Sequence, residues 1–307
     1  MSAEAGGRRT LVVTGATAGL GYWASEQLAA AGHRVVLAAR NPERTDAALR
    51  SIRAAVPDAE LDHVRLDLAD LDSVAAAADT LGERYPDGLD ALVANAGVVG
   101  SRQQRTTAQG HELQIGTNHL GHFALAGRVL PLLAHRAGRI VHLGSIAHRW
   151  ARLDRADPLG AGHYSSYRQY GRSKLAVMLF GFELAERLAD AGSPVSSVVA
   201  HPGFSLDVLA PDRPLVASAR PEPAWTRPAQ RLYAQGKDAG ADPIVHAAVG
   251  DDVRSGEYWG PAGSLQLRGP ATPVVAESKA HDRLEAARLW AASERASGVA
   301  FALDALG

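Results

Sequence analysis

A tyrosine and a lysine four residues apart, in the stretch YGRSK (170–174), have the residue types and spacing that proton-transfer chemistry needs. The chain has 29 arginines and only three lysines, so Lys174 places an ammonium where a solvated helix face would normally carry a guanidinium. Residues i and i+4 share one face of a helix, which brings Tyr170 and Lys174 together. A free tyrosine has a pKa of about 10, and a neighbouring ammonium lowers it by favouring the phenolate. The pair could then relay a proton near neutral pH; the alternative is a solvated Tyr–Lys pair without chemistry.

A glycine-rich turn, TGATAGLG (14–21), lies where the first expected strand meets the first expected helix. Its glycines are Gly15, Gly19 and Gly21. Glycine permits a positive φ and a close backbone approach, while the N–H groups and the dipole at a helix N-terminus favour a phosphate. In this strand–turn–helix setting the spacing indicates a dinucleotide-binding turn. The alternative is a tight turn that binds no ligand.

The end of the second expected strand indicates which dinucleotide would bind. NAD-specific folds usually place Asp or Glu about 20 residues after the glycines, to bind the ribose 2′-hydroxyl. Here the strand ends in Ala38-Ala39-Arg40 without a carboxylate, and the planar guanidinium of Arg40 suits a 2′-phosphate. We therefore expect NADP(H) in preference to NAD(H). The alternative is that Arg40 is one surface arginine among many.

Short apolar runs alternate with helical stretches along most of the chain. Runs rich in β-branched residues and bounded by helices indicate buried parallel strands, expected here at residues 11–15, 34–40, 62–68, 90–97, 139–145 and 194–203. Helices are expected at residues 19–31, 42–54, 71–84, 108–134, 165–190, 242–250 and 279–297, with a further short strand at 257–260. Right-handed crossovers then give an α/β fold, a Rossmann-like doubly wound parallel sheet of about seven strands with helices on both faces, in three α/β/α layers.

Two segments interrupt this alternation, at about residues 146–166 and 204–240, and the second is rich in proline. We expect both to be excursions that cover a substrate at the carboxyl edge of the sheet. On this interpretation residues 1–307 form one Rossmann-fold domain that closes with the helix at about 279–297.

Composition and charge exclude several classes of function. The formal net charge of −1 gives no general attraction to nucleic acid or to anionic membranes. The absence of cysteine excludes disulfides and thiolate chemistry. No HExxH motif or carboxylate cluster accompanies the histidines, so no catalytic metal is expected. There is no apolar N-terminal segment and no run of about 18 apolar residues, so we expect a cytoplasmic protein without a membrane span.

The order of these motifs resembles that of the short-chain dehydrogenase/reductase superfamily. The matching stretches are TGATAGLG (14–21), LDL (66–68), NAG (95–97), NHLGHF (118–123), LGS (143–145), YGRSK (170–174) and HPG (201–203). The resemblance covers residues 10–203, and we expect it to extend to the C-terminus. Within the superfamily the chain is most similar to the branch of retinol dehydrogenases and WW-domain oxidoreductases, through NHLGHF, the SIAH that follows LG, and SKLAVMLFGFELAERL.

The resemblance implies a role for each expected catalytic residue. Tyr170 would be the general acid that protonates a carbonyl oxygen as hydride arrives from nicotinamide, and Ser145 would hydrogen-bond the same oxygen. Lys174 would bind the nicotinamide ribose and influence Tyr170. Asn118 would hold the water that connects Lys174 to a proton relay.

The resemblance also implies the cofactor contacts. Asp67 would accept a hydrogen bond from the adenine amino group, Asn95 to Gly97 would line the cofactor, and Pro202 with Gly203 would shape the turn beside nicotinamide. The full expected cofactor-binding set is Gly15, Thr17, Gly19, Leu20, Gly21, Arg40, Asp67, Leu68, Asn95, Ala96, Gly97, Tyr170, Lys174, Pro202, Gly203 and Ser205.

Two features depart from the family pattern. Members often have Thr five residues after the proline of PG, where it holds the nicotinamide carboxamide, but here Asp207 stands at that position, with Ser205 nearby. The interval between Ser145 and Tyr170 is longer than is usual in the family. It resembles the insertion of the retinol dehydrogenase branch, which would wall the substrate pocket.

Aromatic and apolar residues in the two excursions suggest a bulky, largely apolar substrate, such as a carbonyl of secondary metabolism. The candidate substrate contacts are Ser145, Trp150, Tyr164, Phe204, Leu206 and Trp225. The expected activity is that of an NADP(H)-dependent ketoreductase or alcohol dehydrogenase. The alternatives are an epimerase, dehydratase or C=C reductase of the same fold, or an NADP-binding sensor without turnover. Relatives often pair through the helices that carry Asn118 and Tyr170, which suggests a homodimer.

Overall fold

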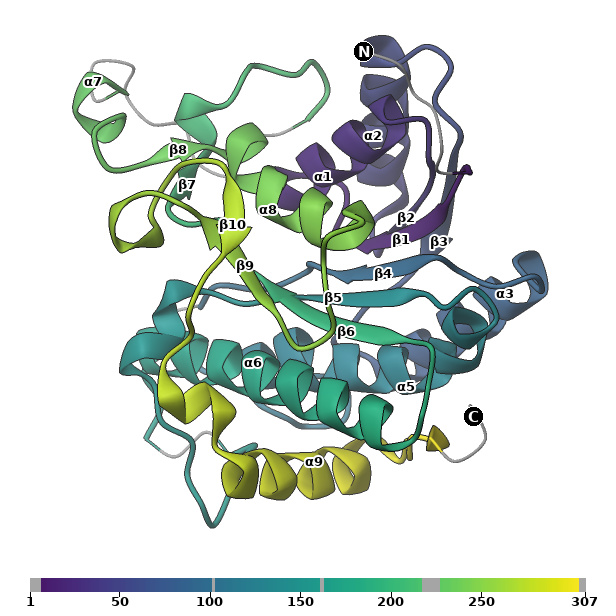
Figure 1. Ribbon diagram of the computed structural model, residues 1–307. Helices are drawn as coiled ribbons and strands as arrows, with labels where there is room; N and C mark the ends of the chain where they lie inside the picture. The colour runs from purple at the N-terminus through teal and green to yellow at the C-terminus, as the bar shows by residue number, and fades with distance from the viewer. Residues whose placement is uncertain (1–6, 101–102, 161–162, 217–226, 304–307) are drawn as a thin grey trace.

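A mostly parallel sheet runs through the centre of the molecule (Figure 1), whose computed structural model describes residues 7–100, 103–160, 163–216 and 227–303. Over these residues the sheet has eight strands in the order β10-β9-β6-β5-β4-β1-β2-β3. In chain order they are β1 (Thr10–Thr14), β2 (Arg34–Ala39), β3 (Leu61–Arg65), β4 (Ala91–Ala94), β5 (Arg139–Leu143), β6 (Ser196–Ala200), β9 (Tyr258–Pro261) and β10 (Ala271–Pro273). All neighbours pair in parallel except β10, which is antiparallel to β9. The predicted doubly wound sheet is confirmed, and β10 adds an edge strand that the sequence did not indicate.

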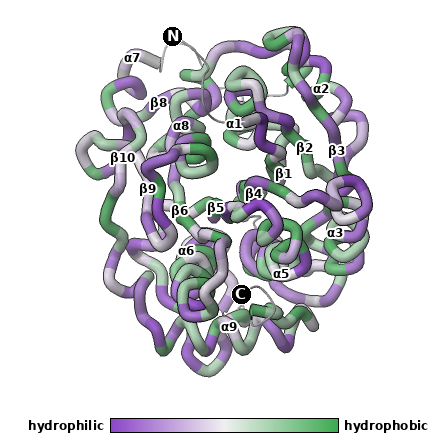
Figure 2. The backbone as a smooth tube through the Cα atoms, turned by 45° about the vertical axis from the view of Figure 1, so that its right-hand side comes forward, coloured by the Kyte–Doolittle hydropathy of each residue, from purple (hydrophilic) through white to green (hydrophobic). Residues whose placement is uncertain are grey.

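Helices cover both faces of the sheet (Figure 2). One face packs against α1 (Gly19–Ala30), α2 (Pro42–Ala55) and α8 (Lys237–Val249). The other packs against α3 (Leu71–Arg84), α5 (Gly121–Ala134) and α6 (Ser166–Asp190). Each interface is a cluster of buried side chains, because parallel strands covered on both faces present apolar residues to both layers. Helix α9 (Arg283–Ser297) lies outside α6 (Figure 1).

The remaining elements are short. They are α4 (Leu113–Ile115), the π-helical turn η1 (Gly116–Leu120), the 3₁₀ turns η2 (Ile146–Trp150), η3 (Asp207–Leu209), η5 (Ser264–Gln266) and η6 (Ser278–His281), α7 (Arg227–Gln230), and the two-stranded parallel pair β7 (Ser205–Leu206) and β8 (Gln235–Gly236). The helix predicted over residues 108–134 is therefore divided into α4, η1 and α5.

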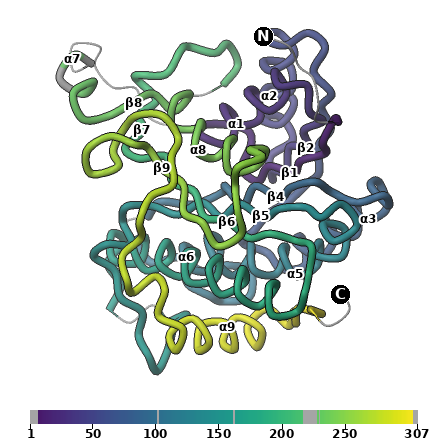
Figure 3. Tube along the Cα trace, viewed as in Figure 1, coloured from purple at the N-terminus to yellow at the C-terminus, as the bar shows by residue number. Residues whose placement is uncertain are grey.

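Helix α8 begins at Lys237 instead of near residue 242, where it was predicted. Its first turn contains Gly240, which weakens any helical pattern in the sequence. A Cβ built on Gly240 would collide with Ser205 Oγ, so glycine allows the start of α8 to pack closely against β7. Tertiary contacts thus extend this helix toward the N-terminus, beyond the start that the sequence pattern predicted. Figure 3 shows the result, with the green α8 beside the purple α1 although they are far apart in sequence.

Candidate active site

The predicted site residues meet at the carboxyl ends of the parallel strands. The strand order reverses between β1 and β4, and ligands of open α/β sheets bind outside the carboxyl ends at such a point. The glycine-rich turn follows β1, Asn95 follows β4, Ser145 follows β5 and Pro202 follows β6. The topology therefore gathers motifs that lie far apart in the sequence at one edge.

The glycine-rich turn is packed too tightly for side chains. Gly15 has φ +67°, and a Cβ there would lie 2.9 Å from the Cα of Ala96. A Cβ on Gly21 would lie 2.5 Å from the carbonyl oxygen of Gly15. Asn95, the residue after β4, connects the turn to that strand, because its Nδ2 donates to the carbonyl oxygen of Thr14 at the end of β1, at 2.8 Å. Glycine at these two positions therefore lets the turn pack directly against the start of α1 and the loop after β4.

This turn fits the phosphate groups of a dinucleotide. The first N–H groups of a helix have no intrahelical acceptor, and no side chain caps the N-terminus of α1. Thr17 and Leu20 are half-buried around it. The Oδ1 of Asn95 is buried and has no hydrogen-bond partner among the described residues. The backbone N–H donors at the start of α1 suit the anionic oxygens of a phosphate.

The adenosine side of the expected site carries Arg40 and Asp67. Arg40 Nη1 lies 3.8 Å from Asp67 Oδ2, and the Arg40 side chain is 68% exposed, so it can reach a ligand. Asp67 Oδ1 accepts from the N–H of Ala69 at 3.0 Å. Leu68 is buried, and a Cβ on Gly121 would collide with its carbonyl oxygen, so Leu68 fixes this loop against α5.

Tyr170 lies in the first half of α6, opposite Ser145 at the end of β5. Burial raises the pKa of the Tyr170 hydroxyl, and a hydrogen bond with Ser145 opposes that rise. Ser145 Oγ also accepts from the N–H of Ala147 at 3.2 Å, which caps η2 and orients the hydroxyl. The two hydroxyls predicted to share one substrate oxygen are thus in contact.

Lys174 is nearly inaccessible to solvent, with 4% of its surface exposed. Its Nζ donates to the carbonyl oxygen of Leu143 at 2.8 Å and lies 5.9 Å from the centre of the Tyr170 ring. Burial lowers the pKa of Lys174 to about 8. The raised pKa of Tyr170 is opposite in direction to the lowering expected from this lysine, because burial of the phenol outweighs the other influences.

Asn118 lies in the π-helical turn η1, a feature frequent at functional sites. Its Oδ1 accepts from the N–H of Val98 at 2.7 Å, and its Nδ2 donates to Val98 O at 3.1 Å and to Ser173 Oγ at 2.9 Å. A Cβ on Gly97 would lie 3.4 Å from Asn118 Oδ1 and 3.7 Å from Lys174 Nζ. Asn118 therefore fixes the loop after β4 to α6, beside Lys174.

The HPG segment is held by close packing and by side-chain hydrogen bonds to its backbone. A Cβ on Gly203 would collide with the carbonyl oxygen of Leu267. Ser205 Oγ donates to the carbonyl oxygen of Pro202 at 2.7 Å, and Gln235 Nε2 donates to the same oxygen at 3.0 Å. Ser205, expected to contact the cofactor, thus uses its hydroxyl proton within the loop.

Sequence reasoning missed Lys237, the first residue of α8. A Cβ on Gly19 would lie 3.2 Å from Lys237 Nζ, so this ammonium stands against the glycine-rich turn. Its Nζ is 2.7 Å from Asp207 Oδ2. The signal that could have found it is the one that drew attention to Lys174, the scarcity of lysine in an arginine-rich chain.

Trp150, one of the expected substrate contacts, lies beside the catalytic helix. A Cβ on Gly171, the residue after Tyr170, would lie 3.4 Å from Trp150 Nε1. The Trp150 side chain is 49% exposed and stacks on Tyr167, with ring centres 5.4 Å apart. This aromatic pair stands at the edge of the site with its ring faces partly open to solvent.

Phe204 is 40% exposed and stacks on Tyr233. The segment around η5 joins it to the Trp150 side, since the Phe204 N–H donates to Leu267 O at 2.8 Å and Arg149 Nη1 donates to Leu265 O at 3.5 Å. The other expected contacts, Tyr164 and Leu206, are half-buried, and Trp225 lies outside the described residues.

The described residues contain neither a cluster of metal-binding side chains nor a membrane-spanning helix. No group of three or more His, Cys, Asp or Glu side chains within residues 7–100, 103–160, 163–216 and 227–303 has a metal-binding arrangement. Over the same ranges, no helix combines the length and apolar character needed to cross a membrane.

Known proteins resemble most of this chain. The family model for short chain dehydrogenases matches residues 9–207. Retinol dehydrogenase 13 of Homo sapiens is 33% identical over 95% of this chain and 85% of its own length. Polyprenol dehydrogenase of Mus musculus is 35% identical over 94% of this chain and 84% of its own length. The crystal structure of an uncharacterized protein from Mycobacterium paratuberculosis is 34% identical, with a TM-score of 0.77 over 95% of this chain and 94% of that chain. The similarity therefore extends through the C-terminal third.

Proposed function

This chain belongs to the short-chain dehydrogenase/reductase family, and we propose that it is an NADP(H)-dependent oxidoreductase acting on a carbonyl or secondary alcohol of a bulky, largely apolar substrate. The observation that supports this most directly is the convergence of Ser145, Tyr170 and Lys174 beside the glycine-rich turn. A proton donor (Tyr170), a hydrogen-bond donor (Ser145) and a buried cation (Lys174) then lie together at the carboxyl edge of the sheet, where a dinucleotide would bind.

Tyr170 and Ser145 act on the substrate oxygen. When bound, the reduced nicotinamide supplies a hydride to the carbonyl carbon. The raised pKa keeps the Tyr170 phenol protonated near neutral pH, so it can donate its proton to the carbonyl oxygen. Ser145 donates a hydrogen bond to that oxygen and stabilises the negative charge that develops there. In alcohol oxidation Tyr170 would take the proton back.

Lys174 holds the ribose and contributes positive charge. With a pKa of about 8, roughly nine in ten molecules carry the ammonium at pH 7. An ammonium has three N–H donors; one is used by Leu143 O, and the others can reach ribose hydroxyls. Asn118 supports this group by fixing the loop that contains Gly97.

The preference for NADP(H) is supported by Arg40, which is exposed at the end of β2 where an NAD-binding carboxylate would stand. The substrate class is supported by the half-exposed aromatic rings of Trp150 and Phe204 at the edge of the site. Two relatives are named for retinol and polyprenol, which are both long apolar alcohols.

The test follows NADPH oxidation with a panel of bulky apolar ketones and aldehydes, in wild type and in Tyr170→Phe. We expect Tyr170→Phe to lower kcat by about 10²- to 10⁴-fold, the usual contribution of a general acid, while its Kd for NADPH stays unchanged. Tyr167→Phe is the matched control, because Tyr167 lies one turn earlier on α6 with an exposed ring that the substitution preserves.

Undiminished turnover in Tyr170→Phe would refute the assignment of the general acid. NADPH binding by the wild type without turnover of any carbonyl or alcohol would favour the sensor alternative. Release of water or epimerisation without net NADPH consumption would favour a dehydratase or an epimerase.

A further inference from the structure

Lys237 takes no part in the chemistry proposed above, yet its side chain reaches the glycine-rich turn. Its Nζ is 3.2 Å from the position that a Cβ of Gly19 would occupy. Only 19% of the side chain is exposed, so the ammonium is held within the fold and does not extend into solvent. Because Gly19 begins α1, this cation faces the same helix N-terminus that fits a phosphate.

Asp207 fixes the position of that ammonium. Its Oδ2 lies 2.7 Å from Lys237 Nζ, and its side chain is 20% exposed. A primary ammonium has three N–H donors, and this ion pair engages one of them. Asp207 begins η3, directly after the short strand β7, which pairs with β8 next to Lys237. Both partners are therefore placed by paired backbone.

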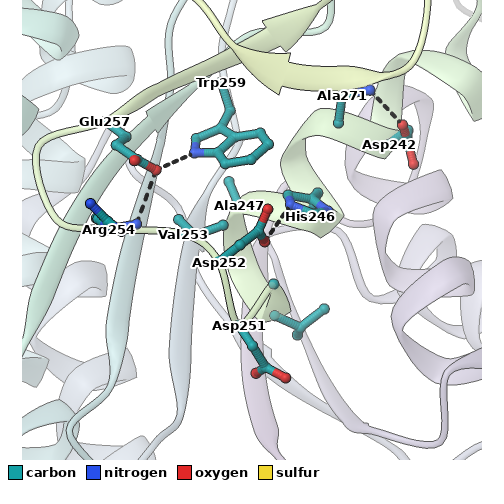
Figure 4. Close-up of polar contacts among 12 residues, drawn as sticks. Asp242, His246, Ala247, Asp251, Asp252, Val253, Arg254, Glu257, Trp259 and Ala271 are labelled. Atoms are coloured by element: carbon teal, nitrogen blue, oxygen red, sulfur yellow. Dashed lines mark hydrogen bonds and ion pairs between the residues drawn. The ribbon is translucent and has the colours of Figure 1, made fainter.

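Helix α8 is itself anchored, which makes the position of Lys237 a property of the framework. Near its start, Gln27 Nε2 of α1 donates to the carbonyl oxygen of Asp238 at 2.8 Å. Further along, Asp242 accepts from the N–H of Ala271 in β10 at 3.0 Å, and His246 Nε2 lies 2.9 Å from Asp252 Oδ1 (Figure 4). The helix is thus tied to α1 on one side and to the sheet edge on the other.

We propose that Lys237 binds the diphosphate of the dinucleotide cofactor at Gly19, and that Asp207 is the positioning residue that aims its ammonium. This inference rests on the proposed function, since it requires a dinucleotide in the turn. Location favours the diphosphate over the 2′-phosphate, because Gly19 lies at the β1–α1 turn whereas Arg40 lies at the end of β2. A compact ammonium suits phosphate oxygens at a crowded backbone.

The ion pair also explains the aspartate that departs from the family pattern. A carboxylate beside a diphosphate would repel it if it stood alone. Paired with Lys237 at 2.7 Å, Asp207 is neutralised. Removing Lys237 alone would therefore delete a phosphate ligand and the positive charge with which Asp207 pairs, while the carboxylate stays next to the diphosphate.

The test measures Kd by titration calorimetry for NADPH, NADH and adenosine 2′-monophosphate, which lacks the diphosphate. We expect Lys237→Gln to weaken NADPH and NADH alike, by about 10- to 100-fold, the effect of losing a hydrogen bond to a charged group. Binding of adenosine 2′-monophosphate should not change, which also shows that the variant is folded. In turnover, KM for the cofactor should rise with little change in kcat, because diphosphate binding is equal in ground and transition states.

Further variants separate electrostatics from structural damage. Lys237→Arg keeps the charge and should retain most of the affinity. Adding Asp207→Asn to Lys237→Gln should restore part of the lost affinity, because it removes a negative charge next to the diphosphate. Asp207→Asn alone should weaken binding, because it releases the Lys237 ammonium from its fixed position. Arg283→Gln is the matched control, since it removes one positive charge from an exposed ion pair with Glu186 on the outer helices and should leave all three Kd values unchanged.

Four outcomes would contradict the inference in whole or in part. Unchanged Kd values in Lys237→Gln, with normal turnover, would refute the role of Lys237 while the proposed function stands. Weaker binding of NADPH without weaker binding of NADH would show that Lys237 contacts the 2′-phosphate instead of the diphosphate. No binding of either dinucleotide by the wild type would refute the proposed function and the inference with it. Wild-type affinity for NADPH and NADH in Asp207→Asn alone, with Lys237 retained, would refute the positioning role of Asp207.

Discussion

Burial decides the charge state of the groups around Tyr170. The ammonium of Lys174 and the phenol of Tyr170 were expected to influence one another mainly through charge, yet the pKa of Tyr170 is raised and that of Lys174 is lowered, both by removal from water. The two shifts favour the neutral acid at Tyr170 near pH 7. That is the form which carbonyl reduction requires, because the hydroxyl must deliver a proton.

Arg40 should determine the preference between NADPH and NADH. Arg40→Asp should raise the Kd for NADPH by about tenfold or more, because a charge-assisted hydrogen bond to the 2′-phosphate is lost. The new carboxylate can accept from a ribose 2′-hydroxyl, so binding of NADH should strengthen. The ratio of the two Kd values, measured by cofactor fluorescence, checks this.

Arg53→Asp makes the same charge change at the other end of α2, on an exposed side chain, and should leave that ratio unaltered. An unchanged ratio in Arg40→Asp itself would show that Arg40 does not read the 2′-phosphate. The neighbouring Asp67, 3.8 Å from Arg40, would then be the residue to vary next.

The motif residues could be placed from the sequence because each directly follows a strand. Gly15, Asn95, Ser145 and Pro202 lie at carboxyl ends whose spatial order the fold class determines. The pair Asp207–Lys237 could not be foreseen in this way. Its members are 30 residues apart in the sequence, and the pairing of the two-residue strands β7 and β8, which have no clear sequence signal, brings them together.

Sequence patterns predicted the long strands and helices and the short strand β9, but they missed β10 and the π-helical turn η1. Strand β10 reads ATP and has no apolar alternation, so its pairing with β9 depends on tertiary contacts alone. The π-helical turn η1 has no distinct sequence signal, because its residues read as the start of one long helix. Both features need the assembled sheet to define them.

The β1–α1 turn should tolerate no side chain at Gly21. Gly21→Ala should abolish measurable dinucleotide binding and lower the urea midpoint of unfolding, since its Cβ would lie 2.5 Å from Gly15 O and force the turn open. Gly82→Ala is the matched control, because nothing lies within 4 Å of the corresponding Cβ on α3. That variant should be more stable by about 0.5–1 kcal/mol, from helix propensity. Wild-type NADPH affinity in Gly21→Ala would contradict the tight turn.

At the scale of the whole molecule, α9 changes how the proposed homodimer could form. Trp290 of α9 packs against Phe123 of α5 and Phe180 of α6, with ring centres 5.3 Å and 5.7 Å away. The C-terminal segment follows, and the Phe301 ring is tilted against that of Trp290, with ring centres 4.8 Å apart. The outer side of α5 and α6 is thus covered in part by the chain itself. Pairing through these helices stays a prediction, and its interface would have to include α9.

The stability of the whole fold should depend on buried neutral histidines. His119, His122, His142 and His201 are each at most 3% exposed. Burial is the largest cause of their lowered pKa values, to about 3 for His119, His142 and His201 and about 4 for His122. His122 Nε2 lies 2.8 Å from Thr14 Oγ1, which joins α5 to β1, and His142 Nε2 lies 3.0 Å from Ser197 Oγ, which joins β5 to the neighbouring β6.

A pKa that is lower in the folded than in the unfolded chain means that the unfolded chain binds more protons between the two values. The stabilisation that comes from keeping these histidines neutral is therefore fully present above pH 6.5 and is lost as the pH falls below 6.5. At pH 5 each such histidine should lower the free energy of unfolding by about 2 kcal/mol. Urea unfolding at intervals from pH 7 to pH 5 should show a steep fall in the free energy of unfolding. His142→Gln, which keeps a donor for Ser197, should reduce that slope by about 1.4 kcal/mol per pH unit, whereas His135→Gln, at an exposed position, should not. A flat profile in the wild type would mean that these rings are protonated, or open to water, in the folded protein.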